Sequence, residues 1–410
     1  MVRGVIGMNN LDGNEMLQKD ELEGIRLKKA IGLEGIICLV LLISFFAILG
    51  DKMGFINSIS TLLNTAFDLL MNTVFYIMAI AVVAGAIANI LTEFGVIALA
   101  NKLLSPLMKP IYGLPGASVM SIFTTYLSDN PAVLTLADDK RFRRYFKKYQ
   151  LPALTNIGTA YGMGMIVTVY MMGLPNPNNE NFILAAIVGN IGAIIGSIVS
   201  VRLMLMKTKK IYGTTVEAEE DSSITYDILE YREVREGSIG ERLMNSMLEG
   251  GASGVKVGFD IIPGVLVICS IVMILTNTTS EAGIYTGAAY EGIGLLPWIG
   301  EKISFIIEPL FGFTSPSAIS VPITALGAAG AAIGLVPNMI TQGLAKAQDV
   351  AVFTAMCMCW SGYLSTHVAM MDGLNFRELT SKAILSHTIG GIVAGIFANY
   401  LFKLIVLIGI

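Results

Sequence analysis

The chain has 410 residues, of which 54% are hydrophobic and only 14% are charged, whereas an ordinary soluble domain carries about 25% charged residues. The interior of a soluble domain cannot absorb that apolar excess, so the composition excludes a soluble globular protein and favours a membrane protein. The formal net charge of −4 lacks the basic excess that nucleic-acid binding requires, so nucleic acid is not an expected partner.

The first 30 residues are predicted to be a cytoplasmic tail. They carry five acidic residues, Asp12, Glu15, Asp20, Glu21 and Glu23, and no apolar core. They therefore do not have the pattern of a cleavable signal peptide. An extra N-terminal span is expected to follow at residues 31–50.

Apolar segments of the length needed to cross a bilayer, about 20 residues each, recur along the chain. We therefore predict an all-α integral membrane fold with about seven spans. The predicted spans cover residues 31–49, 74–91, 151–172, 182–206, 259–276, 353–371 and 384–408.

An internal repeat relates the two halves at a shift of about 200 residues. Residues 110–113 (Pro-Ile-Tyr-Gly) align with residues 309–312 (Pro-Leu-Phe-Gly), and Ile183-Leu184 aligns with Ile384-Leu385. We predict a first repeat over residues 55–206, an acidic cytoplasmic linker over residues 207–250 and a second, inverted repeat over residues 251–410. Such repeats are typical of secondary transporters.

Each repeat contains a segment predicted to be a re-entrant hairpin. In the first, residues 114–127 and 132–145 flank the polar tip Ser128–Pro131. In the second, residues 315–326 and 331–345 flank the tip at residues 327–330. Each arm reaches about half of a bilayer. The short segments before them, 97–110 and 299–309, contain charges and end in proline, so we expect interfacial helices.

The Lys and Arg residues set the expected orientation. With the N-terminus inside and both hairpins non-crossing, nearly all of the 27 Lys and Arg residues fall on the cytoplasmic side, and Lys52, Lys302 and Lys346 fall outside. This asymmetry agrees with the positive-inside rule. We predict a multi-pass protein of the bacterial inner (plasma) membrane with a cytoplasmic N-terminus and an external C-terminus.

We expect the binding site where the interruptions of the helices meet. In inverted-repeat transporters, solute and coupling ions bind near the midplane among interrupted helices. The interruptions here are the two hairpin tips and two spans broken near Gly158 and Gly362. The predicted solute-binding residues are Ser128, Asp129, Asn130, Asn156, Tyr161, Gly327, Gly330, Trp360, Ser361, Thr366 and His367.

Asp129 is the sharpest single candidate. A carboxylate at mid-membrane is costly unless it is paired, hydrated or protonated, so Asp129 is expected to bind something. The alternative is that Asp129, Asn130 and Pro131 form an ordinary exposed turn. Asp68 and Asp260 are either buried partners or interfacial residues.

No catalytic or metal site is predicted. The two histidines, His367 and His387, either relay protons or are structural, and with Cys357 and Cys359 they do not form a recognisable zinc or iron spacing. The phosphate-binding loop and the G-x-S-x-G and H-E-x-x-H motifs are absent, so ATP-driven transport and familiar hydrolase mechanisms lack support. We expect neither an enzyme nor a cofactor.

Three stretches resemble one known family: Pro-Ile-Tyr-Gly-Leu-Pro at 110–115, Tyr-Leu-Ser-Asp-Asn-Pro at 126–131 and Asn-Ile-Gly at 156–158. They resemble the nucleoside-recognition (Gate) domain membrane proteins, over residue 55 to the C-terminus. That family includes the spore maturation proteins and is similar to concentrative nucleoside transporters, in which the order interfacial helix, hairpin, broken helix and span occurs twice.

The resemblance implies a sodium- or proton-coupled symporter that is often oligomeric. The expected partners are then a small-molecule solute, a coupling cation such as bound sodium, the lipid bilayer and further copies of the chain. By position in the family pattern, Asn130, Thr155, Asn156 and Thr159 would coordinate the cation. Concentrative nucleoside transporters have an acidic residue at the second tip, whereas this tip is Gly-Ala-Ala-Gly at 327–330, which removes an expected ribose contact.

We therefore predict a cation-coupled secondary transporter of a small polar solute, nucleoside-like by family analogy, that works by alternating access. One alternative is a non-transporting membrane assembly or sporulation-type protein, which partner binding by the acidic linker would favour. Another is an intramembrane enzyme, which requires Asp129 to converge with His367 or His387.

The orientation gives a first testable prediction. Cysteines placed at Asn178 and Gly283 should react with a membrane-impermeant thiol reagent from outside the cell, and a cysteine at Ser222 only from inside. Labelling of the Ser222→Cys variant from the external face would contradict the whole orientation.

Overall fold

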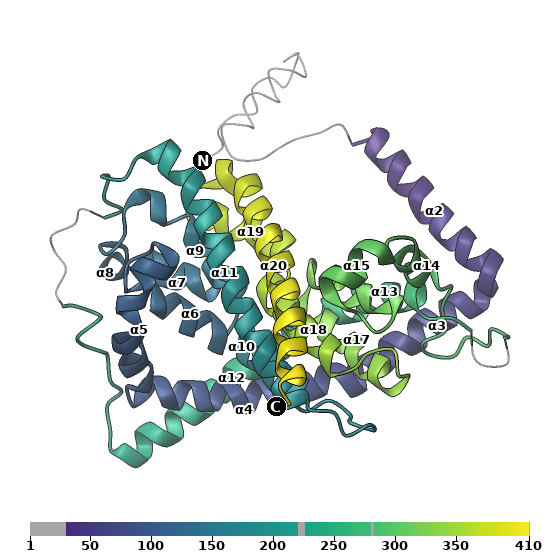
Figure 1. Ribbon diagram of the computed structural model, residues 1–410, viewed down its shortest axis with the longest axis horizontal. Coiled ribbons are helices and arrows are strands. Elements are labelled where there is room, and N and C mark those ends of the chain that lie inside the picture. Colours follow the sequence, from purple (N-terminus) through teal and green to yellow (C-terminus); the bar gives the residue numbers. More distant parts are fainter. Residues whose placement is uncertain (1–29, 220–225, 280–282, 410) are drawn as a thin grey trace, which may run out of the picture. The chain divides into compact units, whose positions relative to one another are not determined.

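The computed structural model describes residues 30–219, 226–279 and 283–409. Apart from Ala30, the predicted tail lies outside the described residues, as does Ser222. The described residues form helices, turns and one isolated bridge between Lys147 and Glu217, without a β-strand (Figure 1). The predicted all-α membrane fold is confirmed.

The chain divides into two compact units, residues 1–58 and 59–410. The first contains helix α2, Leu33–Met53, which corresponds to the predicted N-terminal span. This helix has 21 residues, about 32 Å at 1.5 Å per residue, and most of its apolar side chains are exposed. It is therefore long and apolar enough to cross a bilayer core of about 30 Å.

Two long helices extend well beyond the predicted spans 74–91 and 259–276. One covers Phe55–Glu93 and consists of α3 (Phe55–Asp68), the π-helical turn η1 (Leu69–Val74) and α4 (Phe75–Glu93). The other covers Ile239–Thr276 and consists of α12 (Ile239–Pro263), the π-helical η3 (Gly264–Cys269) and α13 (Ser270–Thr276). Ser238 and Glu241 form a capping box, so α12 begins inside the segment predicted as linker.

Small residues let α4 and α12 touch through their backbones. A Cβ atom on Gly85 would lie 2.3 Å from the carbonyl oxygen of Gly250, and one on Gly250 would lie 2.1 Å from the carbonyl oxygen of Gly85. One turn on, a Cβ on Gly254 would lie 2.3 Å from the carbonyl oxygen of Ala81. Close crossings at small residues spaced by four positions are a general way to pack helices in membranes.

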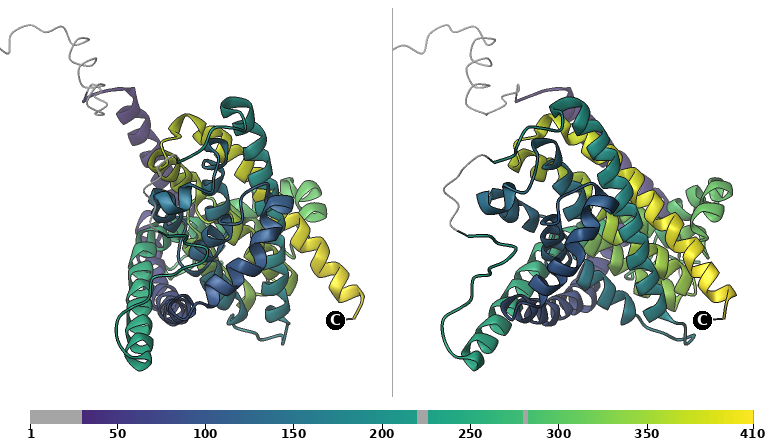
Figure 2. Two further views of the ribbon diagram at one scale, coloured as in Figure 1. Left: turned by 90° about the vertical axis from the view of Figure 1, so that its left-hand side faces the viewer. Right: turned by 60° about the vertical axis from the view of Figure 1, so that its left-hand side comes forward.

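Helices α11 (Phe182–Tyr212) and α20 (Thr380–Leu407) also pack side by side, as Figures 1 and 2 show. Their contact is reciprocal, since a Cβ on Gly196 would meet the Gly390 carbonyl oxygen at 2.5 Å and a Cβ on Gly390 would meet the Gly196 carbonyl oxygen at 2.7 Å. In the view of Figure 1, α5–α8 and α13–α17 lie on opposite sides of this pair.

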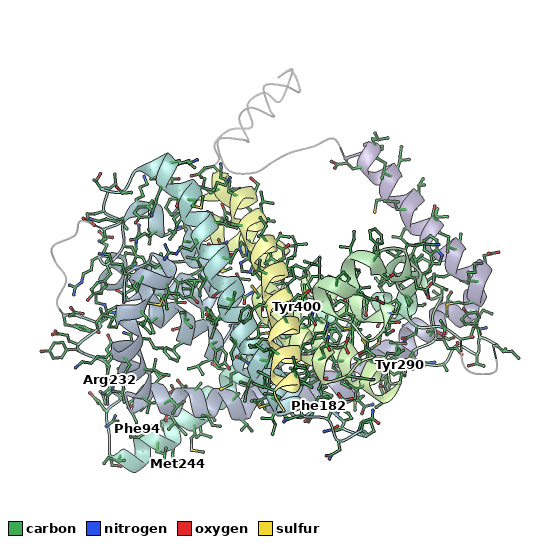
Figure 3. The ribbon with its side chains drawn as sticks, in the orientation of Figure 1. Phe94, Phe182, Arg232, Met244, Tyr290 and Tyr400 are labelled. Atoms are coloured by element: carbon green, nitrogen blue, oxygen red, sulfur yellow. The ribbon has the colours of Figure 1, made fainter. Side chains whose placement is uncertain are left out.

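Equivalent contacts join these helices to the two segments predicted to be interfacial. Arg202 on α11 donates to the Ile111 carbonyl oxygen at 2.8 Å, at the end of α5 (Val96–Tyr112). On α20, Tyr400 (labelled in Figure 3) donates to the Pro309 carbonyl oxygen, also at 2.8 Å, in α15 (Ser304–Phe311). The helix α14 (Leu295–Lys302) precedes α15. Arg202 also donates to the Pro110 carbonyl oxygen, and Pro110 is the residue that the sequence repeat aligns with Pro309. The division into inverted repeats stays a prediction.

Both predicted hairpins consist of short helices. The first has α6 (Ser118–Leu127) and α7 (Ala132–Asp138), followed by α8 (Lys140–Arg143). Its second arm stops before the predicted end at residue 145, because the Asp139 carboxylate accepts the Arg141 amide and caps a new helix. The second hairpin has the 3-10 turn η4 (Pro316–Ile319), α16 (Ser320–Ala325) and α17 (Ala329–Thr341).

Two predicted spans are broken. The first consists of α9 (Ala153–Ala160) and α10 (Gly164–Met172), and the second of α18 (Ala347–Trp360) and α19 (Tyr363–Gly373). The first break lies at residues 161–163, so Gly158 is inside α9 and is not the break. Among the residues that the structure describes, five helices are long and apolar enough to cross a membrane, or six if a bent pair counts as one span. The predicted count of seven is not confirmed.

The acidic segment between the halves is bound to the chain itself. Glu217, Asp227 and Glu233 form ion pairs with Lys147, Arg144 and Arg141, in the basic exit of the first hairpin. The Tyr145 hydroxyl also donates to Asp227 and lowers the pKa of that carboxyl. The contacts of Asp227 therefore stabilise the fold above the ordinary pKa of an aspartate, and this stabilisation is lost as the pH falls through the lowered pKa.

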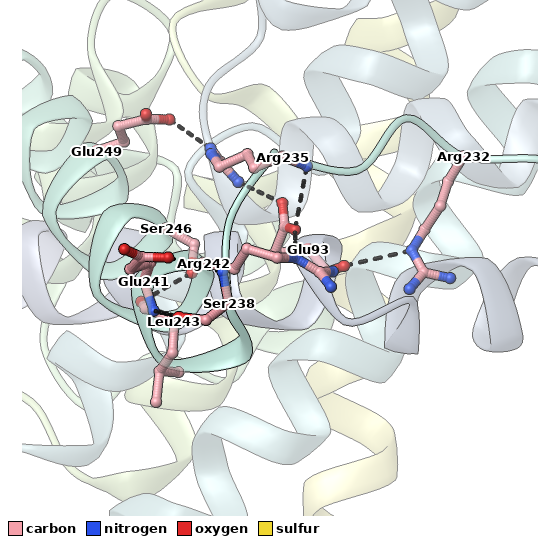
Figure 4. Close-up of polar contacts among 9 residues, drawn as sticks. All are labelled: Glu93, Arg232, Arg235, Ser238, Glu241, Arg242, Leu243, Ser246 and Glu249. Carbon is pink, nitrogen blue, oxygen red and sulfur yellow. Dashed lines mark hydrogen bonds and ion pairs between the residues drawn. The ribbon is translucent and has the colours of Figure 1, made fainter.

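Farther along the same segment, a buried carboxylate joins it to the long helices (Figure 4). Glu93, at the end of α4, accepts from Arg235 at 2.6 Å and from Arg242 at 2.7 Å, and its side chain is only 3% exposed. Arg232 donates to the Glu93 carbonyl oxygen at 3.3 Å. Glu93 thus connects α4, α12 and the preceding polar segment.

The glycine contact predicts a position-specific loss of stability. Gly250→Ala places a methyl group on the Gly85 carbonyl and should lower the stability by about 1–3 kcal/mol, as overpacking does. Gly251→Ala is the matched control, because its Cβ would meet the nearest Val82 atom at an ordinary 3.5 Å. Thermal unfolding in detergent measures both variants. Equal melting temperatures would contradict the backbone contact.

Candidate functional site

The two helix breaks touch each other. At the α18/α19 break, Ser361 and Gly362 adopt left-handed conformations with φ of 36° and 69°. The Ser361 hydroxyl donates to the Gly162 carbonyl oxygen in the α9/α10 break at 3.1 Å. The Gly362 amide donates to the Ala325 carbonyl oxygen at 2.8 Å, at the end of α16. The second break is therefore in contact with both the first break and the second hairpin.

The first hairpin tip reaches the same point through Asn130, which is only 1% exposed. Its Nδ2 donates to the Ser361 carbonyl oxygen at 2.7 Å and lies 3.4 Å from the Thr366 hydroxyl. Gly162 makes room for it, since a Cβ there would lie 1.3 Å from Asn130 Oδ1. Asp129 lies beside it, and its carboxylate accepts the Asn130 amide at 2.7 Å.

A cavity of about 190 Å³, the tip cavity, lies where these four interruptions meet. Both hairpin tips, both breaks and the α12/η3 junction contribute to its wall. It is lined by Asp129, Asn130, Met163, Asp260, Ile261, Gly264, Gly327, Ala328, Ala329, Gly330, Ala331, Ser361, Gly362 and Thr366.

Two larger cavities lie along the same long helices. The first-hairpin cavity, about 340 Å³, lies between α6 and the α4/α12 crossing and includes Ala81, Gly250 and Ser128. The second-hairpin cavity, about 420 Å³, lies between η1 and the end of α17 and includes Asn72, Tyr170 and Asn338. The three cavities therefore follow one another along the long helices.

Six predicted binding residues line the tip cavity: Asp129, Asn130, Gly327, Gly330, Ser361 and Thr366. Ser128 instead lines the first-hairpin cavity. Asn156, Tyr161, Trp360 and His367 line none of the three. The hairpin tips and the helix breaks thus lie together, as the sequence predicts. The broken spans contribute fewer side chains to the tip cavity than expected.

Asn156 and Tyr161 point from the first broken span toward α11. Asn156 Nδ2 donates to the Ser200 hydroxyl at 2.8 Å and to the Ala383 carbonyl oxygen at 3.3 Å. The Tyr161 hydroxyl lies 2.7 Å from that of Tyr112 and 3.0 Å from that of Ser197. Both residues therefore connect helices inside the protein.

The two histidines form a fully buried pair. Their rings are 4.6 Å apart, and Tyr363 packs against both. His387 Nδ1 lies 2.8 Å from the Ser200 hydroxyl, and its Nε2 contacts the Cys359 carbonyl oxygen. Neither histidine lines the tip cavity. The convergence with Asp129 that the intramembrane-enzyme alternative requires is therefore not found.

The residues predicted to bind a cation do not share one hydrogen-bond network among the described residues. The Thr155 hydroxyl contacts the Met371 sulfur at 3.1 Å, and the Thr159 hydroxyl lies 3.4 Å from His367 Nδ1. The amide oxygens of Asn130 and Asn156 are buried without a hydrogen-bond partner. Within the described part of the chain, no group of three or more His, Cys, Asp or Glu side chains has the arrangement of a metal site.

Asp260 is a cavity residue whose role the sequence left open. It lies on α12 three residues before Pro263, at the point where α12 gives way to the π-helical η3. The sequence feature that could have identified Asp260 is its acidic side chain inside an apolar span. Its position opposite the hairpin tips follows only from the way the helices pack.

No protein-family profile matches the chain and no curated protein matches it. Solved structures of CNTnw, a concentrative nucleoside transporter, have a similar fold. The inward-facing, substrate-bound CNTnw structure has a TM-score of 0.53 and 14% identity, covering 94% of this chain and 85% of that chain. A doubly substituted CNTnw in an outward-facing state has a TM-score of 0.52 and 13% identity, covering 96% and 87%. At these identities the similarity shows the fold alone.

The close packing of Asn130 against Gly162 gives a prediction about the first hairpin tip. Gly162→Ala should displace the Asn130 side chain and loosen the tip, because the new methyl group overlaps Oδ1. Deuterium exchange of the peptide containing residues 128–132 should become faster. Gly327→Ala is the control, since its Cβ would meet Ile268 at 3.5 Å. An unchanged exchange rate in the Gly162→Ala variant would contradict the close packing of Asn130 against Gly162.

Proposed function

We propose that this chain is a cation-coupled secondary transporter of a small polar solute that works by alternating access. The observation that carries the proposal is the tip cavity, which is enclosed by four interruptions of helical structure at once. Irregular backbone at membrane depth is tolerated only inside protein or beside a watery cavity. Its concentration at one cavity is typical of transporter binding sites.

The series of cavities supports alternating access. Along the α12–α13 helix, the first-hairpin cavity touches Gly250, the tip cavity touches Asp260 and the second-hairpin cavity touches Met273. At 1.5 Å per residue, Gly250 to Met273 covers about 35 Å, close to the thickness of a bilayer core. A unit that carries the tips and breaks along these helices would open the tip cavity to each side in turn. The similar fold of CNTnw in inward- and outward-facing states fits this proposal.

Unpaired oxygen atoms support coupling to a cation. The buried amide oxygens of Asn130 and Asn156 lack hydrogen-bond partners, and the hydroxyls of Thr155 and Thr159 are fully buried nearby in sequence. Hard cations take oxygen ligands of these kinds. A sodium ion bound by some of these oxygens in one conformation would link its gradient to the movement.

A nucleoside-like solute rests on the family analogy and on the fold of CNTnw. We place the transporter in a bacterial inner membrane with the N-terminus inside and the C-terminus outside, on the distribution of Lys and Arg. The non-transporting assembly alternative relied on an acidic linker free for a partner. Three of its carboxylates are instead paired with the chain's own basic residues, which favours the transporter.

Alternating access predicts reciprocal accessibility of the outer cavities. In a background with the exposed Cys38 removed, Ser128→Cys should react with a thiol reagent from the cytoplasmic side and Asn338→Cys from the external side. Any solute or ion gradient that raises one labelling rate should lower the other, because only one side is open at a time. Labelling rates in right-side-out and inside-out vesicles measure this.

Asn178→Cys, in the exposed loop before α11, is the control and should react at a constant rate. Uptake into proteoliposomes under a sodium or proton gradient then tests transport itself, with solutes found by thermal shift. Simultaneous increases at both cysteines, or the absence of gradient-driven uptake of every bound solute, would contradict the proposal.

A further inference from the structure

The second-hairpin cavity is the largest of the three cavities, and the proposed transport mechanism gives it only a role in access. Its volume of about 420 Å³ is within the range of about 300–1,000 Å³ for small-molecule pockets. None of its lining residues lines the tip cavity, so a ligand could occupy it independently. It is lined by Asp68, Asn72, Thr73, Tyr76, Tyr170, Gly173, Leu174, Pro175, Met273, Tyr290, Gly334, Pro337, Asn338 and Thr341.

Two buried hydroxyl groups face this cavity without a hydrogen-bond partner. Tyr170, on α10, is only 2% exposed, and Thr73, in the π-helical η1, is 8% exposed. Among the described residues neither hydroxyl makes a hydrogen bond, yet neither is completely enclosed by protein atoms. The Ser270 hydroxyl is the contrast, because it is also unpartnered but is completely enclosed. Buried polar groups are ordinarily hydrogen-bonded, and both residues line the cavity, so their missing partner belongs to a ligand there.

The other polar groups of the cavity offer both donors and acceptors. The Asp68 carboxylate accepts from Asn72 Nδ2 at 2.8 Å and from the Tyr290 hydroxyl, which leaves roughly half of its lone-pair sites free. The half-buried Asn338 side chain makes no hydrogen bond within the described residues, so it offers donors and an acceptor. A carboxylate ligand only accepts and an ammonium only donates, whereas a hydroxyl group does both. The set therefore matches a ligand that carries hydroxyl groups.

Charge and aromatic surface limit the ligand further. Among the described residues that line the cavity, Asp68 is the one charged side chain and none is Lys, Arg or His, so an anionic ligand would be repelled. The rings of Tyr76 and Tyr170 lie with their centroids 5.8 Å apart, and Tyr290, labelled in Figure 3, is the third tyrosine of the wall. Tyrosine combines an apolar ring with a polar tip, and a sugar ring likewise has an apolar C–H face and a rim of hydroxyl groups.

We propose that the second-hairpin cavity is a second binding site, which takes a neutral, hydroxyl-rich small molecule: a free sugar or the sugar of a nucleoside. The hydroxyl groups of the ligand supply the missing partners of Thr73 and Tyr170 and donate to Asp68, while the tyrosine rings cover its apolar face. Binding here requires neither the tip cavity nor transport, so this site goes beyond the proposed function.

Four probes separate the hydroxyl groups, the charge and the base. In calorimetric titrations of the purified full chain, glucose or uridine should bind at least tenfold tighter than glucuronate, which adds a negative charge, and uracil, which lacks the sugar. Binding of glucose identifies a free sugar, and binding of uridine without glucose identifies the sugar of a nucleoside. Equally tight binding of glucuronate or uracil, or failure of both glucose and uridine to bind, would overturn the proposal.

Removal of single hydroxyl groups assigns the binding to this cavity. Tyr170→Phe and Thr73→Val keep the shape of the side chain and should each reduce affinity for the bound probe about fivefold, the usual contribution of one hydrogen bond between uncharged groups. Their melting temperatures without ligand should equal that of the parent, because neither hydroxyl is bonded within the described protein. Ser270→Ala removes an unpartnered hydroxyl outside the cavity and is the control, which should bind like the parent. Unchanged affinity in both cavity variants would contradict the assignment.

A measurement on the parent protein covers the case in which a variant does not fold. The bound probe should slow deuterium exchange in peptides that contain residues 68–76 and 334–341 and leave the peptide containing residues 128–132 unchanged. Protection of residues 128–132 alone would place the probe in the tip cavity and overturn the proposal. Uptake into proteoliposomes is a separate readout: if the probe binds here and no solute is taken up, the transporter proposal fails and this site remains.

Discussion

The structure depends on one constraint: a helix that breaks inside a bilayer must find partners for its freed backbone groups within the protein. At the α18/α19 break, the Gly362 and Leu364 amides donate to the Ala325 and Leu326 carbonyl oxygens at 2.8 and 3.3 Å. The Ser361 carbonyl oxygen accepts from Asn130. Backbone hydrogen bonds therefore hold the second hairpin against the break, and the Asn130 side chain holds the first tip against it. The tip cavity is the space that remains between them.

Small residues make this arrangement possible and also decide its chemistry. A Cβ on Gly362, whose φ is 69°, would lie 2.9 Å from the Gly327 carbonyl oxygen, so close approach at the second tip requires glycine. The same requirement leaves that tip without polar side chains. The polar side chains that line the cavity are then those of Asp129, Asn130, Asp260, Ser361 and Thr366, and none of them comes from the second tip.

The sequence predicted the hairpins and the broken spans because proline, glycine and polar residues interrupt otherwise apolar runs. It did not predict which side chains of the broken spans face the cavity. All eight residues of α9 are buried, so no polar face indicates its orientation, and Asn156 turned out to face α11. The position of Asp260 depends on the α4/α12 crossing, and the early end of α7 depends on a local cap at Asp139. These features result from helix packing and from single hydrogen bonds, and the periodicity of the sequence does not predict them.

If the chain works by the proposed alternating access, the segment between the halves would limit how far the first hairpin moves. Glu233 pairs with Arg141 at 3.2 Å, while Arg235, two residues later, pairs with Glu93 at 2.6 Å. Extended backbone covers at most about 7 Å between Glu233 and Arg235, so a movement that exceeds the reach of this backbone and of the two side chains would separate one pair. The Glu233 side chain is 78% exposed and that of Glu93 only 3%, so the Arg141 pair opens first. Exposed ion pairs weaken as salt is added, so the resistance of this segment to such a movement would fall as the ionic strength of the surrounding solution rises.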